Sequence, residues 1–319
     1  MTKPLKVGLA LGSGAARGWA HIGALQVLEA EKVPIDLVAG TSMGSLIGAV
    51  YLSGNLDALH KTALKLDWRS IIYYFFEPNI PRSGMVNGRR IQTFMKEFIQ
   101  AGPIESLPKP YACVAADLMR GGAVVLKDGD LVEAVRASIA MPGILKPVAR
   151  GKRVLVDGGV VDPVPVNVVR EMGADFTIAI DVNHGLLHKA EKSVPVGTLE
   201  RIRRFSDRRN SRILQSVTHR VDDMNWDRMP LLSRWMSPAP VPNIFDVIGN
   251  SVRIMEVQIS EARLAVNPPD VLVRPEVGSL NILDFDKAEP CIEAGRIAMQ
   301  EAMPSLREKL EAKRILNSE

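Results

Sequence analysis

Short apolar runs alternate with stretches of helical spacing along most of this chain. The run at 5–11 ends in a glycine-rich segment, after which apolar residues recur at helical spacing, and the run at 35–40 leads into a small-residue helix at 43–53. Further runs typical of buried strands lie at 111–117, 123–129, 153–159, 176–182 and 270–277, and helices are expected at 90–99, 131–138, 166–172 and after Asp286. This alternation predicts an α/β fold, with a mostly parallel central sheet in a three-layer α/β/α arrangement.

The balance of apolar and charged residues is that of a globular protein. The chain has 319 residues, of which 46% are hydrophobic and 24% charged, so a disordered or collagen-like chain is excluded. The strand pattern disappears at 186–243, where an Arg-rich helical stretch is expected. We therefore predict one domain over 1–319 that contains a helical, Arg-rich insertion at 186–243.

Several classes of site and location are disfavoured. Cys113 and Cys291 lie far apart, which excludes a disulfide framework and a CxxC metal site. No His, Cys or carboxylate cluster has the spacing of metal ligands, so no metal and no cofactor are expected. No apolar run reaches the roughly 18 residues of a transmembrane helix. We expect a cytoplasmic protein, with any membrane contact peripheral to the inner face of the cell membrane.

Positive charge is concentrated in one segment. Lys and Arg number 40 against 36 Asp and Glu, and the segment Glu200–Arg234 holds nine Arg and five acids, so it carries the whole net charge of +4. Such a segment suits an anionic membrane surface, although the interspersed acids equally fit a solvated helix face. No nucleic-acid-binding module is recognisable, and nucleic acid is not an expected partner.

The most specific motif is a GxSxG element formed by Gly40, Ser42 and Gly44 between an expected strand and an expected helix. On such a turn a serine hydroxyl is exposed and the helix N-terminus favours developing negative charge, as a nucleophile requires. The alternative is a plain turn in which Ser42 caps the helix.

A serine nucleophile needs a base, and two arrangements are open. An α/β-hydrolase order would allow Ser42, Asp157 and His184, but that fold builds several strands before its nucleophile and only one precedes Ser42. Asp157 is followed by Gly158 and Gly159 at the end of an expected strand. Because carboxyl ends of parallel strands converge, Asp157 could meet Ser42 and act as the base if burial raised its pKa. Alternatively, Asp157 is only a turn residue.

The glycine loop formed by Gly12, Gly14 and Gly18 follows the first strand and leads into a helix. Its backbone N–H groups could cradle an oxyanion. A dinucleotide site would need an acid after the second strand, and a phosphate-binding loop would need Gly-Lys-Ser/Thr, and both are missing. His21, just after the loop, is expected to support it by hydrogen bonding. The apolar stretch 71–76 fits core packing or, if it lies near the crevice, contact with acyl chains.

The glycine loop GSGAARG, the GTSMG turn and the DGG turn, in this order, resemble the patatin-like phospholipases, in particular their short bacterial members. The segment SIAMPGILKPV at 138–148 looks like a further family segment, with Leu145 where Phe is frequent. The similarity spans roughly residues 5–182.

The resemblance implies a three-layer α/β/α fold and a serine acyl hydrolase with a Ser-Asp dyad. In the dyad, Ser42 attacks an acyl ester and Asp157 accepts its proton. The expected oxyanion donors are the backbone N–H groups of Gly12, Gly14 and Ala15. The expected substrate is a phospholipid or another acyl-ester lipid.

Two positions bear on that expectation. Arg17 matches a basic residue of the family that would hold an anionic headgroup. Ala15 stands where glycine is usual, and a positive φ there would strain the loop. The alternative reading is therefore a non-catalytic, lipid-binding regulatory protein that retains the fold.

Overall fold

The computed structural model describes residues 4–75, 86–184 and 244–317. Residues 1–189 and 249–319 form one compact unit, and residues 190–248 form a second. The expected insertion at 186–243, including the basic segment, lies outside the described residues, so the domain organisation stays a prediction. The architecture below is that of the first unit.

An eight-stranded sheet forms the centre of the described unit. Its order is β5-β6-β3-β2-β1-β7-β8, with β4 paired to β3 off this path. The neighbours among β3, β2, β1, β7 and β8 run parallel, whereas β4 and β6 pair antiparallel with β3, and β5 pairs antiparallel with β6. The predicted mostly parallel sheet is confirmed. The strands are β1 (Val7–Leu11), β2 (Leu37–Thr41), β3 (Tyr111–Asp117), β4 (Ala123–Leu126), β5 (Val148–Arg150), β6 (Arg153–Asp157), β7 (Phe176–Ile180) and β8 (Val271–Val273).

The helices of the described residues are α1 (Ala20–Ala30), α2 (Met43–Leu52), α3 (Leu56–Ala63), α4 (Trp68–Phe75), α5 (Arg89–Phe98), α6 (Leu131–Ser138), α7 (Val166–Glu171), α11 (Ile244–Val266) and α12 (Ala288–Leu316), with 3-10 turns η1 (Ala15–Trp19), η2 (Ile104–Ser106) and η3 (Gly158–Val160). The helices expected after the glycine loop, at 43–53, 90–99, 131–138 and 166–172 and after Asp286 are present within about two residues, whereas α3, α4 and α11 were not expected. Within the described ranges, none of these helices has a stretch long and apolar enough to span a bilayer.

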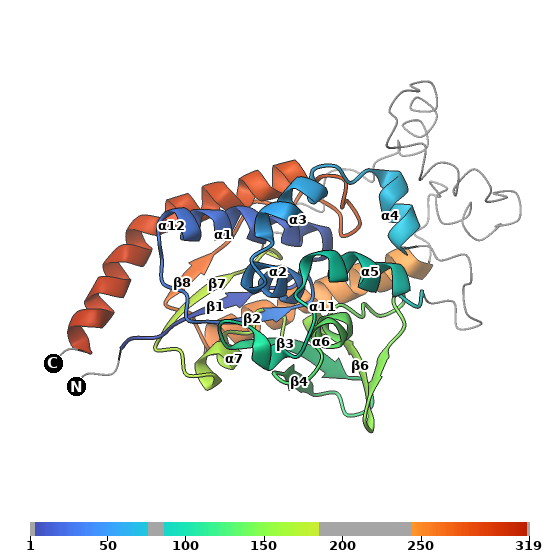
Figure 1. Ribbon diagram of the computed structural model, residues 1–319, viewed down its shortest axis with the longest axis horizontal. Helices are drawn as coiled ribbons and strands as arrows, with labels where there is room; N and C mark the ends of the chain where they lie inside the picture. Colours follow the sequence, from blue (N-terminus) through green and yellow to red (C-terminus); the bar gives the residue numbers. More distant parts are fainter. Residues whose placement is uncertain (1–3, 76–85, 185–243, 318–319) are drawn as a thin grey trace, which may run out of the picture. The chain divides into compact units, whose positions relative to one another are not determined.

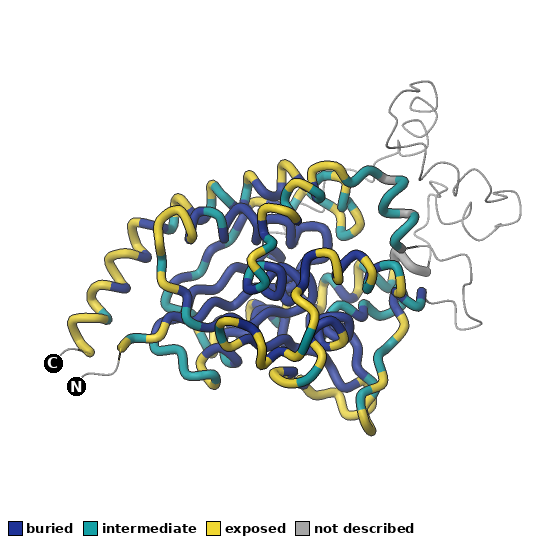
Figure 2. Tube along the Cα trace, viewed as in Figure 1, coloured by how far each residue is buried: buried dark blue, intermediate teal, exposed yellow. Residues whose placement is uncertain are grey.

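Both faces of the parallel strands are buried, which is why their sequences are almost uninterrupted apolar runs. In β1, Val7, Leu9 and Leu11 face a core shared with α1, α2 and α12, whereas Ala10 faces a second core with α7. Figure 1 shows α1 and α12 side by side over one face of the sheet and α7 on the other. The strands between them are buried along their length (Figure 2).

Two strands meet end to end along one edge of β3. β2 pairs parallel with β3 as far as Thr41 opposite Val114, and β6 pairs antiparallel from the other direction as far as Asp157 opposite Ala115. Their carboxyl ends therefore abut at consecutive positions of β3. Asp157 therefore lies at the end of β2, as expected, but β6 reaches this point as an antiparallel strand and not as a further parallel one.

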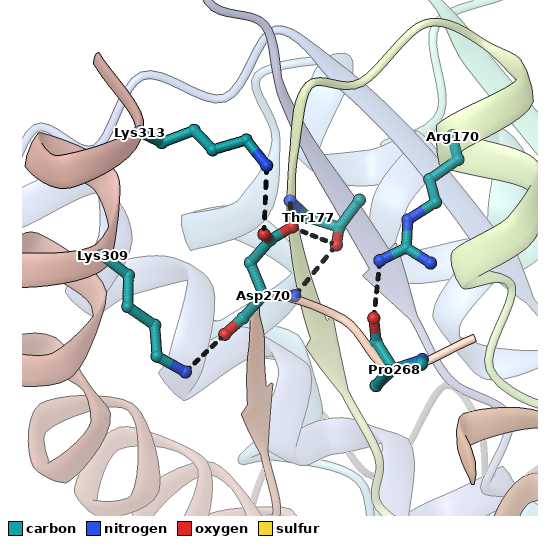
Figure 3. Close-up of polar contacts among 6 residues, drawn as sticks. All are labelled: Arg170, Thr177, Pro268, Asp270, Lys309 and Lys313. Carbon is teal, nitrogen blue, oxygen red and sulfur yellow. Dashed lines mark hydrogen bonds and ion pairs between the residues drawn. The ribbon is translucent and has the colours of Figure 1, made fainter. Parts of the chain in front are cut away.

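A polar cluster far in sequence from the glycine motifs fastens the edge strand β8 (Figure 3). Asp270 accepts hydrogen bonds on Oδ2 from the backbone N and the Oγ1 of Thr177, both at 2.8 Å. Lys309 of α12 donates to the carbonyl of Asp270 at 2.8 Å, and Lys313 lies 3.8 Å from Oδ1. Arg170 of α7 donates to the carbonyl of Pro268. These contacts connect β7, α7 and α12 to the segment that immediately precedes β8.

Candidate active site

Ser42 occupies a strained turn between β2 and α2. Its backbone has φ 54° and ψ −123°, a conformation that residues with a side chain rarely adopt and that costs about 1–3 kcal/mol. The flanking glycines allow the close packing of this turn. A Cβ at Gly44 would collide with the carbonyl of Leu11, and one at Gly40 would lie 2.5 Å from the carbonyl oxygen of Gly44. Ser42 therefore has a non-helical backbone conformation and directly precedes the first residue of α2.

The hydroxyl of Ser42 does not cap α2. No hydrogen bond runs from its side chain to the first turn of the helix. Instead its Oγ donates to Oδ2 of Asp157 at 2.6 Å, and the serine is 5% exposed. The helix-cap interpretation of Ser42 is therefore wrong, and the hydroxyl is aimed at a carboxylate.

Asp157 combines the two roles that the sequence left open. Its Oδ1 accepts from the backbone N of Gly159 at 2.8 Å, as a turn residue would, while Oδ2 accepts from Ser42. The side chain is buried at the end of β6. Burial raises the pKa of Asp157 to about 6, although the hydrogen bonds from Ser42 and Gly159 act in the opposite direction. This pKa gives the carboxylate a proton affinity closer to that of a useful general base at neutral pH.

Two N–H groups of the glycine loop donate to carbonyls elsewhere in the chain, and two others have no acceptor among the residues that the structure describes. Gly12 donates to the carbonyl of Ile180 at 3.0 Å, and Ser13 donates to the carbonyl of Pro163 at 2.8 Å. By contrast, the described residues supply no hydrogen-bond acceptor to the backbone N of Gly14 or Ala15. Gly12 is therefore not an available oxyanion donor, contrary to expectation. The sequence pattern could not reveal this, because Ile180 reaches Gly12 through the pairing of β1 with β7.

Ala15 adopts the left-handed conformation that the sequence analysis treated as a source of strain. Its φ is 47°, whereas Gly14 has an extended φ of 166°. Glycine is needed at Gly14 for space, since a Cβ there would collide with the side chain of Val182. The loop thus carries a non-glycine residue at the position that requires positive φ.

His21 supports the loop from the first turn of α1. Its Nε2 lies 2.8 Å from the carbonyl oxygen of Gly12, and because that oxygen can only accept, Nε2 carries the proton. Complete burial lowers the pKa of His21 to about 4, so the ring is neutral. The expected supporting contact is present.

Arg17 is placed differently from the expected headgroup-binding position. Its side chain is 0% exposed and is absent from the residues that line the apolar cavity described below. Within the described chain, none of its three guanidinium nitrogens has a hydrogen-bond partner. Burial lowers the pKa of Arg17 to about 10, with Glu256 as the strongest opposing charge. The geometry therefore does not support a headgroup-binding role for Arg17. Its guanidinium is a charge buried inside the protein.

An apolar cavity opens beside Ser42. It encloses about 820 Å³ of empty space, including a part open to solvent. Ile71 and Tyr74 of α4 are among its walls, as the acyl-contact reading of 71–76 requires, and the segment at 139–145 supplies another wall, including Leu145. The lining residues are Ala15, Trp19, Ser42, Met43, Leu46, Leu66, Ile71, Tyr74, Ile91, Phe94, Ile139, Met141, Ile144, Leu145, Leu283 and Phe285.

Two residues near the dyad escaped the sequence analysis. The Oγ of Ser138 accepts from the backbone N of Ser42 at 2.9 Å and donates to the carbonyl of Val114 at 2.6 Å, so it fixes the strained turn. Its place at the start of the SIAMPG segment was the available signal. Glu256 of α11 lies against Gly159, where a Cβ would collide with its Oε1. No local motif surrounds Glu256, so only the fold reveals it.

The described histidines do not complete a triad. His184 lies 4.0 Å from Glu261, and His60 is 2.9 Å from the amide nitrogen of Gln26. The α/β-hydrolase arrangement of Ser42, Asp157 and His184 is wrong for this chain, because Asp157 accepts directly from Ser42 with no histidine between them.

Comparisons with known proteins identify sequences and a solved structure that are similar to this chain. An uncharacterized NTE family protein of Mycobacterium tuberculosis (strain H37Rv) is 31% identical over 93% of this chain and 91% of its own length. The human patatin-like phospholipase domain-containing protein 6 is 38% identical over 182 residues, which are 55% of this chain and 13% of the human protein. Among solved structures, VipD from Legionella pneumophila matches with a TM-score of 0.45 and 14% identity, over 95% of this chain and 68% of VipD.

A family model also covers the part of the chain that holds these motifs. The model described as patatin-like phospholipase matches residues 9–170, a range that includes the glycine loop, Ser42 and Asp157. With this match over half of the chain and the mycobacterial relative over nearly all of it, the chain belongs to the patatin-like phospholipase family.

Proposed function

We propose that the chain is a serine acyl hydrolase that cleaves lipid esters through Ser42 and Asp157. The observation that carries the proposal is the 2.6 Å hydrogen bond from the Ser42 hydroxyl to a buried carboxylate, at the edge of an apolar cavity that Ser42 itself lines. A nucleophile and a base within hydrogen-bond reach are the minimum that covalent catalysis requires.

In the first half-reaction, the Ser42 Oγ attacks the acyl carbonyl carbon while its proton moves to Oδ2 of Asp157. The carbonyl oxygen becomes an oxyanion, for which the N–H groups of Gly14 and Ala15 are the available donors. Collapse of the tetrahedral intermediate breaks the ester C–O bond. Asp157 then returns the proton to the leaving alcohol, and the acyl group stays on Ser42.

In the second half-reaction, water attacks the acyl carbon and gives a proton to Asp157. The Ser42–acyl bond breaks, Ser42 regains a proton from Asp157, and the fatty acid leaves. Gly159 supports this cycle because its N–H bonds Oδ1 and thereby fixes the carboxylate while Oδ2 exchanges protons.

The cavity indicates the kind of substrate. Its walls are almost entirely aliphatic and aromatic, which suits an acyl chain and offers little to a polar acyl group. A phospholipid or another acyl-ester lipid is therefore the proposed substrate. Association of the basic segment Glu200–Arg234 with an anionic membrane stays a prediction from sequence.

Intact-mass spectrometry after incubation with a fluorophosphonate tests the nucleophile without a choice of substrate. Ser42 Oγ displaces fluoride from phosphorus, so we expect one adduct in the wild type and none in Ser42→Ala. Ser106→Ala is the matched control, since Ser106 is exposed on η2 and is expected to leave labelling unchanged. An equal adduct in Ser42→Ala would refute the assignment.

A lipid-binding protein without catalysis is the second candidate, and the φ of 47° at Ala15 is the observation that favours it. Strain at an oxyanion donor would weaken the hole. This candidate predicts no adduct and no ester hydrolysis, together with saturable binding of a fluorescent fatty acid that is lost when the cavity is filled.

A further inference from the structure

Glu256 of α11 carries a buried carboxyl group that lies between the Asp157 turn and the glycine loop. It is 7% exposed, and its Oε1 packs so closely on Gly159 that a Cβ there would collide with it. Gly159 is the residue whose N–H holds Oδ1 of Asp157. Glu256 therefore packs directly behind the turn that orients the proposed base.

The same side chain reaches the glycine loop. Glu256 interacts with the side chain of Ser13, an interaction that favours the ionised carboxylate, and the Ser13 Oγ accepts from Nδ2 of Asn183 at 3.1 Å. The backbone N of Ser13 is bonded to Pro163 as well. Ser13 directly precedes Gly14 and Ala15, whose N–H groups have no acceptor within the described ranges, so the position of Ser13 sets theirs. Glu256 thus connects the loop of the proposed oxyanion donors to the Asp157 turn.

The charges around Glu256 oppose one another. The Asp157 carboxylate, with Asp181 beyond it, disfavours a second negative charge, whereas the buried guanidinium of Arg17 favours one. Arg253 lies on the same helix as Glu256, and its positive charge repels the guanidinium of Arg17 and lowers the pKa of Arg17. Burial, reinforced by Asp157, outweighs Arg17 and raises the pKa of Glu256 to about 8. At neutral pH the carboxyl is therefore mainly protonated.

We propose that Glu256 is a positioning residue that braces the glycine loop against the Asp157 turn, and that turnover requires its carboxyl to be neutral. The inference rests on the proposed hydrolase function. An ionised Glu256 would place a negative charge beside Ser13, next to the N–H groups that must stabilise an oxyanion. This charge opposes the transition state, so loss of this proton forms the alkaline limb of the pH–rate profile.

The test is the pH dependence of kcat for hydrolysis of p-nitrophenyl butyrate by the wild type and Glu256→Gln. Glutamine keeps the shape and the contact with Ser13 but cannot ionise. For a group titrating at about 8, wild-type kcat falls about tenfold between pH 7 and pH 9. We expect Glu256→Gln to lose this fall and to change by less than about twofold over the same range.

The matched control is Glu261→Gln on the same helix. Glu261 has a 54% exposed side chain that pairs with Arg274, so its variant keeps the wild-type profile. KM is expected to be unchanged in both variants, because Glu256 does not line the cavity. A Glu256→Gln variant that folds and retains the wild-type alkaline limb overturns the proposal.

A second measurement keeps the proposal testable if Glu256→Gln fails to fold or if the wild type hydrolyses no ester. Side-chain carboxyl resonances of ¹³C-glutamate-labelled wild type are titrated by NMR, and Glu256 is assigned as the resonance that is missing from Glu256→Asp. A midpoint well above those of the exposed glutamates supports the proposal, and an ordinary midpoint overturns it. An absent fluorophosphonate adduct with a raised midpoint would instead count against the hydrolase function alone.

Discussion

The hydroxyl of Ser42 donates a hydrogen bond directly to the carboxylate of Asp157, with 2.6 Å between Oγ and Oδ2. The contact exists because β2 and β6 end opposite neighbouring residues of β3, Val114 and Ala115. Each strand brings its terminal polar group to the same point from opposite directions. The dyad geometry is therefore a property of sheet pairing, and it does not depend on a long flexible loop.

Asp157→Asn should slow turnover severely while leaving the fold intact. The amide is nearly isosteric and can still accept from Gly159, but it cannot take a proton from Ser42. General-base catalysis contributes about 10²–10⁴-fold, and kcat is expected to fall by that factor. In the wild type, kcat should also fall as pH drops below about 6, because Asp157 becomes protonated. Ester hydrolysis from pH 4.5 to 7.5 measures both effects, and a variant with wild-type kcat would contradict the role as base.

The same substitution is expected to stabilise the protein at high pH. Burial raises the pKa of Asp157 to about 6 in the folded state, against about 3.9 in an unfolded chain, so folding favours the protonated form. The stability associated with this proton is complete below about pH 4 and is lost as pH rises through 6. Relieving this cost in Asp157→Asn is worth up to about 3 kcal/mol at pH 8 and little at pH 4.

Urea unfolding of both proteins at pH 4 and pH 8 provides the measurement. The difference between variant and wild type isolates Asp157 from the other buried acids. If Asp157→Asn lowers the free energy of unfolding, and lowers it more at pH 8 than at pH 4, the sign is the reverse of that expected. Such a result would favour a structural role for the carboxylate.

Ala15→Gly should relieve strain in the glycine loop. A left-handed φ costs a residue with a Cβ about 1–2 kcal/mol, and the greater freedom of glycine in the unfolded chain returns about 0.5–1 kcal/mol of that. We expect the free energy of unfolding to stay level or to rise by up to about 1 kcal/mol, and fluorophosphonate labelling to be no slower. Ala24→Gly, inside α1, is the control and should destabilise the protein by about 1 kcal/mol or more. Equal losses in both variants would show that Ala15 is not strained.

The sequence contains the chemistry of the site but not all of its partners. Ser42 and Asp157 could be predicted because a strand, a tight turn and a short helix are encoded locally, and glycines at fixed offsets mark such turns. The direction of β6 could not be predicted, because a five-residue strand with three apolar residues at its centre has the same hydrophobic pattern in either direction.

Other features depend on residues distant in the chain. The N–H of Gly12 is occupied because β7 lies beside β1, and Arg17 is buried by its surroundings although its residue type suggests exposure. Glu256 belongs to a helix whose sequence carries no motif, yet it contacts two loops that do. Long-range packing decides these roles, and a single sequence does not encode it in any local pattern.

The cavity should select substrates by acyl-chain length, and Ile91 on α5 provides the test. Ile91 is 8% exposed and lines the cavity, so Ile91→Trp fills space that a long chain would occupy. Burial of a methylene contributes about 0.8 kcal/mol, and loss of room for two of them lowers kcat/KM about tenfold or more. We expect this loss for p-nitrophenyl esters of long chains and little change for the acetate. Ile297→Trp on α12, where the residue is 47% exposed, makes the same substitution outside the cavity and should alter neither. A filled acyl pocket discriminates between substrates by chain length, whereas a distorted Ser42–Asp157 pair slows all of them equally. A uniform loss across all chain lengths in Ile91→Trp would therefore contradict the assignment of this cavity to the acyl chain.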